Sequence, residues 1–183
     1  MTVGLVVVLV AVATTGIVLI SNFQPLRAGS QLGPPLGVDA TALQIDWLDA
    51  PSNSWTYQVP VRSGLTFRYR FSIWNHGPLP ITITRIGVPA SEQDGGLTMV
   101  PVAVYPDLSQ VPLGGKWQWQ PVHPLALDAR QMAGVEMQVT LASCVTGVRW
   151  NQVPVTFEVL GIERHVFAPL NTQIDLVGPA SNC

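Results

Sequence analysis

The chain has 183 residues, of which 48% are hydrophobic and only 11% are charged, and its formal net charge is −2 at pH 7. This hydrophobic content excludes a disordered chain. The slightly negative charge provides no basic surface of the kind that binds nucleic acid. A single domain with a short additional segment fits the length.

The first predicted element is a membrane anchor. Residues 3–20 are almost entirely apolar and contain no charge. As a helix they would extend roughly 27 Å, close to the hydrocarbon core of a bilayer at about 30 Å. We predict that residues 1–20 form a transmembrane anchor that contacts the bilayer through residues 3–20. The alternative is a signal peptide cleaved near residues 11–13, but no Lys or Arg precedes the apolar run, which exceeds the usual length of about 7–15 residues.

A segment rich in proline and glycine follows. Residues 21–40 show no hydrophobic periodicity and carry almost no charge. Such a composition is typical of a partly extended linker. We therefore expect residues 21–40 to hold the next domain a short distance from the bilayer surface.

The rest of the chain, residues 41–183, contains patterns typical of strands. Alternate positions of the clearest one are apolar: Leu65, Phe67, Tyr69, Phe71 and Ile73. This period of two predicts a half-buried strand over residues 64–75. After a turn at residues 75–78, further strands are predicted at 81–84, 135–142 and 153–160, and weaker ones at 43–48, 55–61, 97–105, 117–122, 164–167 and 174–177.

These short strands, separated by Gly, Pro and Asn turns, are typical of an all-β fold, the immunoglobulin-like antiparallel β-sandwich. We find no amphipathic helix of useful length after the anchor. The predicted organisation is a transmembrane anchor over residues 1–20, a linker over residues 21–40 and an immunoglobulin-like β-sandwich over residues 41–183.

Two stretches also carry a resemblance. Residues 67–87, FRYRFSIWNHGPLPITITRIG, form a strand, an N-x-G turn and a second strand, and the stretch from Cys144 through VPVTFEVLGIERHVFAPL to Cys183 places a hairpin between two cysteines. The first resembles the hairpin of many bacterial immunoglobulin-like envelope modules. The second is similar to the C-terminal half of uncharacterised single-pass envelope proteins of actinobacteria with an immunoglobulin-like ectodomain. The resemblance implies the fold, and it implies no activity.

Cys144 and Cys183 are the two cysteines, and both follow the apolar segment. An even number in an exported domain predicts a disulfide, which would stabilise the fold by roughly 3–4 kcal/mol. The alternative is two reduced thiols in a cytosolic domain, which the positive charge of Arg27 weakly favours. The cysteines and the domain type outweigh that charge, so we predict a cytoplasmic-membrane protein with its C-terminal domain extracytoplasmic.

Motifs for catalysis or metal binding are missing from the sequence. A blue-copper site needs His and Met soon after its Cys, and the residues after Cys144, VTGVRWNQV, include neither. There is no G-x-S-x-G, no H-E-x-x-H and no phosphate-binding glycine loop. We therefore expect no enzyme activity, no metal and no cofactor.

Tryptophans are the remaining candidates for a site. Trp117 and Trp119 alternate with glutamines and share one face of a predicted strand, where they would pack in the core, contact a partner or stack on a sugar. Trp74 lies on the polar side of its strand, which favours exposure or an interface. Together with the low charge, these residues predict a binding or structural protein, an accessory subunit of a larger membrane or envelope complex. The alternative is a module that binds cell-wall glycan through Trp117 and Trp119.

Overall fold

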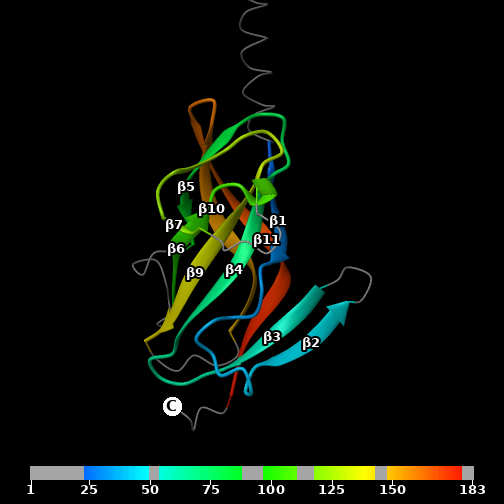
Figure 1. Ribbon diagram of the computed structural model, residues 1–183, viewed down its shortest axis with the longest axis vertical. Coiled ribbons are helices and arrows are strands. Elements are labelled where there is room, and N and C mark those ends of the chain that lie inside the picture. Colours follow the sequence, from blue (N-terminus) through cyan, green and yellow to red (C-terminus); the bar gives the residue numbers. More distant parts are fainter. Residues whose placement is uncertain (1–22, 50–53, 88–96, 111–117, 143–147, 179–183) are drawn as a thin grey trace, which may run out of the picture.

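The computed structural model describes residues 23–49, 54–87, 97–110, 118–142 and 148–178 (Figure 1). The strands are β1 (Leu26–Gln31), β2 (Gln44–Asp49), β3 (Ser54–Pro60), β4 (Thr66–Asn75), β5 (Ile81–Ile86), β6 (Leu97–Tyr105), β7 (Gln120–Pro121), β8 (Leu125–Leu127), β9 (Met132–Leu141), β10 (Arg149–Val159) and β11 (Ile162–Val177), and a short 3-10 helix spans Leu108–Gln110. Within these ranges no helix is long and apolar enough to cross a bilayer. The predicted anchor over residues 3–20 lies outside them.

The strands form two sheets, one with the order β1-β4-β9-β6-β7 and one with the order β2-β3-β11-β10-β5-β8. In an immunoglobulin-like sandwich, strands A, B, E and D share one sheet and strands C, F and G the other. The same arrangement is found here, with A, B, E and D as β1, β4, β9 and β6, and with C, F and G as β5, β10 and β11. The predicted all-β sandwich of this type is therefore confirmed. One detail differs, because β3 pairs with β11 in parallel and makes the second sheet mixed.

The core lies between the two sheets and is built by the alternation that the sequence displays. On β4, every second side chain from Phe67 to Ile73 is buried. Phe67 and Tyr69 face Trp150 of β10 across the core, with ring centroids 6.4 and 6.3 Å apart. Aromatic side chains bury large apolar areas, so this cluster joins the sheets at the centre of the sandwich.

The linker prediction for residues 21–40 is wrong at β1. Leu26 lies opposite Asn75 in an antiparallel pairing of β1 with β4, and its side chain is buried. The backbone approaches β4 so closely at Gly29 that an added Cβ would lie 1.8 Å from the Ser72 hydroxyl oxygen. Residues 26–31 lack alternating apolar side chains, and they are held in the sheet by hydrogen bonds to β4 instead. The chain is therefore attached to the sandwich from Leu26 onward.

The C-terminal strands also differ from expectation. Residues 164–167 and 174–177 were expected to form two strands, but they belong to the single strand β11, whose register with β10 shifts between Trp150 and Gln152. In the predicted strand over residues 117–122, only Gln120–Pro121 forms β structure among the described residues.

The turn between β4 and β5 is stabilised by the side chain of Asn75, which is buried. Its Nδ2 donates hydrogen bonds to the carbonyl oxygens of Leu79 at 2.8 Å and Asp128 at 2.9 Å, and its Oδ1 accepts one from the Gly77 N–H at 3.1 Å. Asn is favoured in turns because its side chain bonds to the nearby backbone. These bonds also join the turn to the connection between β8 and β9.

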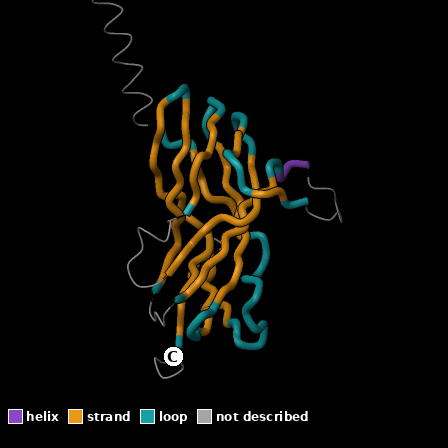
Figure 2. Tube along the Cα trace, turned by 90° about the vertical axis from the view of Figure 1, so that its left-hand side faces the viewer, coloured by secondary structure: helices purple, strands orange, loops and turns teal. Residues whose placement is uncertain are grey.

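The described chain begins at this same end of the sandwich. The ring of Phe23 packs on Gly77, where an added Cβ would lie 2.4 Å from it. Thr82 lies opposite Glu158 in the β5–β10 pairing, so the β10–β11 turn at residues 160–161 projects from this end as well. Figure 2 shows connecting turns gathered there. This end, formed by Phe23, the β4–β5 turn and the β10–β11 turn, is named the entry end.

Candidate functional site

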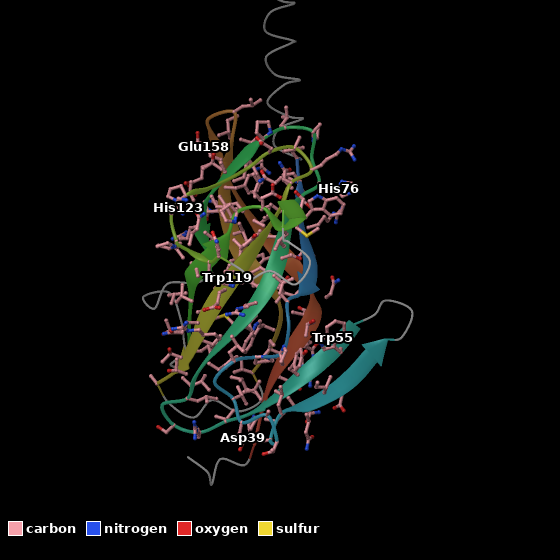
Figure 3. The ribbon with its side chains drawn as sticks, in the orientation of Figure 1. Asp39, Trp55, His76, Trp119, His123 and Glu158 are labelled. Carbon is pink, nitrogen blue, oxygen red and sulfur yellow. The ribbon has the colours of Figure 1, made fainter. Side chains whose placement is uncertain are left out.

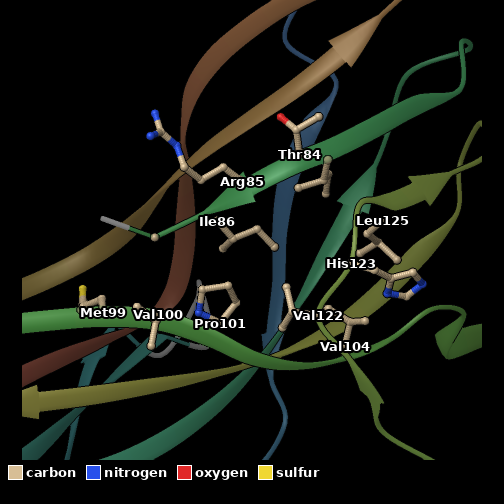
Figure 4. A pocket seen from close by; sticks show the side chains of 12 residues that line it. Thr84, Arg85, Ile86, Met99, Val100, Pro101, Val104, Val122, His123 and Leu125 are labelled. Atoms are coloured by element: carbon tan, nitrogen blue, oxygen red, sulfur yellow. The ribbon is translucent and has the colours of Figure 1, made fainter. Parts of the chain in front are cut away.

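An apolar pocket opens on the side of the sandwich where β5 and β8 of one sheet approach β6 of the other (Figure 4). Its volume is about 220 Å³, and its lining is Ile83, Thr84, Arg85, Ile86, Gly87, Met99, Val100, Pro101, Val104, Val122, His123 and Leu125. Sites for small molecules usually measure roughly 300–1,000 Å³. The pocket is therefore better matched to one or two apolar side chains of a partner.

Backbone features of β5 and β6 shape this pocket. Gly87 directly follows β5 and has a φ of 83°, and an added Cβ there would lie 2.7 Å from the Met99 carbonyl oxygen. On β6, the register with β9 shifts between Pro101 and Ala103, and such a bulge bends a strand locally. The close contact at Gly87 and the bend after Pro101 thus set the separation of the two walls.

Each wall has a strand edge that the described strands pair only in part. β5 pairs with β10 along one edge and, along the other, with β8 only over residues 81–83. β6 pairs with β9 along one edge and, along the other, with β7 only at Ala103 and Val104. Open edges of this kind accept an extended peptide as an added strand, and alternate side chains of that peptide enter neighbouring pockets.

The mouth of the pocket is polar at His123. The Nδ1 of this exposed side chain lies 2.9 Å from the Pro121 carbonyl oxygen. A carbonyl oxygen only accepts hydrogen bonds, so Nδ1 carries the proton and, in the neutral ring, Nε2 is the acceptor. His123 and Arg85 therefore add polar groups to the rim of an otherwise apolar cavity.

Trp119, one of the predicted contact residues, lies over the first sheet (Figure 3). Its ring would lie 3.2 Å from a Cβ added at Gly134, which alternates with the core residues Ala133 and Val135, so the ring packs on the outer face of that sheet. Its half-buried ring meets Tyr105 edge-on with centroids 6.2 Å apart, and the Arg70 guanidinium lies 4.9 Å from the ring centroid. Arg70 in turn pairs with Glu136 at 2.6 Å. Trp119 is thus held on an outer polar surface. Trp117 lies outside the described residues.

Trp74 is half-buried at the entry end. Its Nε1 donates a hydrogen bond to the Arg130 carbonyl oxygen at 3.1 Å, and its ring lies 4.6 Å from the His76 ring. The indole N–H of Trp74 is therefore hydrogen-bonded within the chain, and part of its ring faces solvent. Cys144 and Cys183, the predicted disulfide pair, lie outside the described residues.

Charged groups form small networks. In the part of the chain that the structure describes, no three His, Cys, Asp or Glu side chains are grouped closely enough to hold a metal ion. The largest network joins Glu136, which is buried on the outer face, to Arg68 at 3.1 Å and to Arg70 at 2.6 Å. Both cations stabilise the carboxylate of Glu136 in place of water.

The pocket residues carry no distinctive pattern in the sequence. They come from three strands far apart in the chain, and residues such as Ile83 and Val104 have the alternation of ordinary core positions. The available signal was the apolar Val122 next to His123, in a stretch between Pro121 and Pro124 that is unsuited to a long strand.

No protein-family model and no curated protein sequence matches the chain. Similar solved structures include the VesB protease of Vibrio cholerae, with a TM-score of 0.38 and 12% identity over 74% of this chain and 32% of that one. The apo PCuAC domain from PmoF1 has a TM-score of 0.37 and 12% identity over 81% of this chain and 95% of that one. The ASH/PapD-like domain of human CEP192 has a TM-score of 0.32 and 11% identity over 82% of this chain and 96% of that one.

This chain thus spans about a third of the VesB structure. At these scores the comparisons assign no function to the chain, and the fold assignment rests on the strand order described above.

Proposed function

We propose that the protein is a membrane-anchored, extracytoplasmic binding protein, an accessory subunit of a larger membrane or envelope complex. In this proposal, residues 1–20 hold the chain in the cytoplasmic membrane, and a disulfide between Cys144 and Cys183 closes the β-sandwich. The observation that supports binding is the apolar pocket beside the open edges of β5 and β6.

The proposed partner is a membrane or envelope protein that presents an extended segment with an apolar side chain. Its backbone would pair with the open edge of β5 or β6, and the apolar side chain would fill the pocket. Anchoring in the same membrane raises the effective concentration of the two proteins. A small site of about 220 Å³ is then sufficient for stable association.

Site-specific cross-linking tests this proposal. A photoreactive residue replaces Val122, which lines the pocket and is 43% exposed, in the full-length protein within native membranes. The matched control carries the same group at Ile45 on β2, which is 52% exposed and remote from the pocket. We expect one dominant adduct with an envelope protein from position 122, and its loss when Val100→Trp fills the pocket. Equal adducts from both positions would refute the proposal.

The membrane topology has its own test. Membrane-impermeant thiol reagents are applied to intact cells and to inverted vesicles, before and after reduction. We expect Cys144 and Cys183 to react only after reduction and only from outside the cell. Two reduced thiols that react solely from the cytosolic side would reverse the proposed orientation.

Glycan binding is the second candidate, and the surface around Trp119 favours it. Tyr105 and Arg70 lie against the half-buried ring of Trp119, and Arg70 pairs with Glu136. Such a surface offers an aromatic ring with adjacent hydrogen-bonding groups. Isolated cell-wall polymer should then retain the protein and release the Trp119→Ala and Trp117→Ala variants. Absence of binding, or binding that both substitutions leave unchanged, removes this candidate.

A further inference from the structure

Leu160, at the tip of the β10–β11 hairpin, is an apolar side chain in an unfavourable position, because of both its backbone conformation and its exposure to water. Val159 pairs with Ile162, so Leu160 and Gly161 form a two-residue turn with φ values of 51° and 77°. Turns with positive φ at both positions favour Asn-Gly, because Asn tolerates this conformation better than larger side chains do. Leu160 is also 66% exposed to water. A contact outside the sandwich would account for a leucine at this position.

The surroundings of the tip are apolar as well. Ile162, the first residue after the two-residue turn, is 37% exposed. Pro78 and Pro80 are exposed in the neighbouring β4–β5 turn. These residues belong to the entry end, which therefore presents several apolar groups together.

The chain emerges from this same end. Phe23 packs on the β4–β5 turn, and the Pro25 carbonyl oxygen accepts a hydrogen bond from the His76 N–H at 2.8 Å. The apolar run over residues 3–20 ends only three residues before Phe23. Three residues extend at most roughly 11 Å. If residues 3–20 span the membrane, the tether is too short to lift the entry end far from the lipid headgroups, which occupy about 5–8 Å on each side of the hydrocarbon core.

We infer that the entry end of the β-sandwich rests on the bilayer, with Leu160 and Ile162 of the hairpin tip in the headgroup region. This inference rests on the proposed function, because it requires the anchor to lie in the membrane. It replaces the expected arrangement, in which a flexible linker separates the domain from the bilayer. Trp74 and His76 lie at the same end, and aromatic side chains such as Trp are enriched at membrane interfaces.

Charges near the tip limit the depth of this contact and identify the lipid class. Glu158 and Glu163 are exposed beside the tip, and Glu163 pairs with His165 at 3.4 Å. Carboxylates are repelled by anionic lipids and are costly in hydrocarbon. The contact is therefore apolar and confined to the headgroup region, and it does not require anionic lipids.

Fluorescence quenching in lipid nanodiscs tests the inference on the full-length chain. An environment-sensitive dye is attached at Leu160→Cys, and lipids with a spin label near the headgroup serve as the quencher in phosphatidylcholine nanodiscs. The control is Ile45→Cys on β2. This strand pairs with β3, which joins β11 at residues 172–177, far from the 160–161 turn. Unmodified protein provides the background from Cys144 and Cys183.

We expect at least threefold stronger quenching at position 160 than at position 45, with little change when a third of the lipid is anionic. A second reporter, Pro78→Cys, should lose about half of its quenching when Leu160→Asn removes the apolar contact. Equal quenching at positions 160 and 45 would overturn the inference.

Flotation of the same samples separates this inference from the proposed function. If the protein floats with lipid but shows no preferential quenching at position 160, the anchor is supported and the inferred contact is refuted. Protein that does not float with lipid refutes the anchor and the inference together.

Discussion

Tyr69 brings a polar hydroxyl into the apolar core. Its ring stacks on Phe71 with centroids 5.7 Å apart, yet its buried hydroxyl and that of Thr172 have no hydrogen bond of normal geometry. Both residues line a void of about 10 Å³, which is close to the space that one water occupies. Burial raises the pKa of Tyr69, and the neighbouring Trp150 offsets part of that rise. The hydroxyl therefore contributes little to stability at neutral pH.

Replacing Tyr69 with Phe tests this description. At pH 7 we expect the free energy of unfolding to change by no more than about 1 kcal/mol, because little hydrogen bonding is lost. Because the pKa of Tyr69 is raised in the folded state, its contribution is fully present below the unfolded pKa of about 10 and declines as pH rises above it. Tyr69→Phe should therefore lose less stability than wild type between pH 9 and 11 in urea unfolding.

The control is Tyr105→Phe, since Tyr105 is only half-buried on the outer face. This variant should keep the alkaline sensitivity of wild type. If Tyr69→Phe shows the wild-type pH dependence, Tyr69 does not retain its proton in the way described.

Gly87 is the residue whose small size the pocket requires. An alanine there would have a positive φ of 83° and a Cβ 2.7 Å from the Met99 carbonyl oxygen. We expect Gly87→Ala to destabilise the fold by about 2–4 kcal/mol, the sum of the backbone cost of about 1–2 kcal/mol and the displacement of β6. Gly161→Ala is the matched control, because its φ is 77° and nothing lies within 4 Å. Equal losses in urea unfolding would show that the contact with Met99 is unimportant.

At the scale of elements, the sequence is most informative where one face of a strand is buried. The alternation in β4, β9 and β10 predicts those strands because each contributes apolar side chains to the core at every second position. β1 has no such pattern, since Leu26 is its one large apolar residue, and it forms through hydrogen bonds to β4. The pocket could not be predicted either, because it depends on how far β5 and β6 lie apart and not on the pattern within either strand.

The β10–β11 hairpin allows the effect of turn sequence to be measured. Replacing Leu160 with Asn should raise the free energy of unfolding by about 0.5–1 kcal/mol, because Asn accepts the positive φ of 51° with less strain. Leu160→Ala retains that strain and should remain within about 0.5 kcal/mol of wild type. The measurement is thermal unfolding of full-length wild type, Leu160→Asn and Leu160→Ala in the same detergent. A decrease for Leu160→Asn would mean that Leu160 stabilises the sandwich itself.

For the whole molecule, β1 is the connection between the predicted anchor and the sandwich. It lies at the edge of the first sheet and, among the strands that the structure describes, pairs only with β4. A pull or tilt at Phe23 is therefore transmitted to β4 through the β1–β4 pairing, whose register shifts between Ala28 and Gln31. A flexible linker over residues 21–40 would have uncoupled the domain from the predicted anchor.

Two truncations measure the contribution of β1 to the fold. A chain without residues 1–22 keeps β1 and should unfold cooperatively. A chain without residues 1–31 loses the β1 ladder and the burial of Leu26, which alone is worth roughly 1.5–3 kcal/mol, and it exposes the edge of β4 to intermolecular pairing. We expect the chain without residues 1–31 to melt at least 10 °C below the chain without residues 1–22, as measured by circular dichroism, and to aggregate in size-exclusion chromatography. In the longer chain, Leu26→Ala should lower stability by about 2–5 kcal/mol. Two truncated chains of equal stability would make β1 dispensable, and residues 21–40 would then act as the linker that their composition predicts.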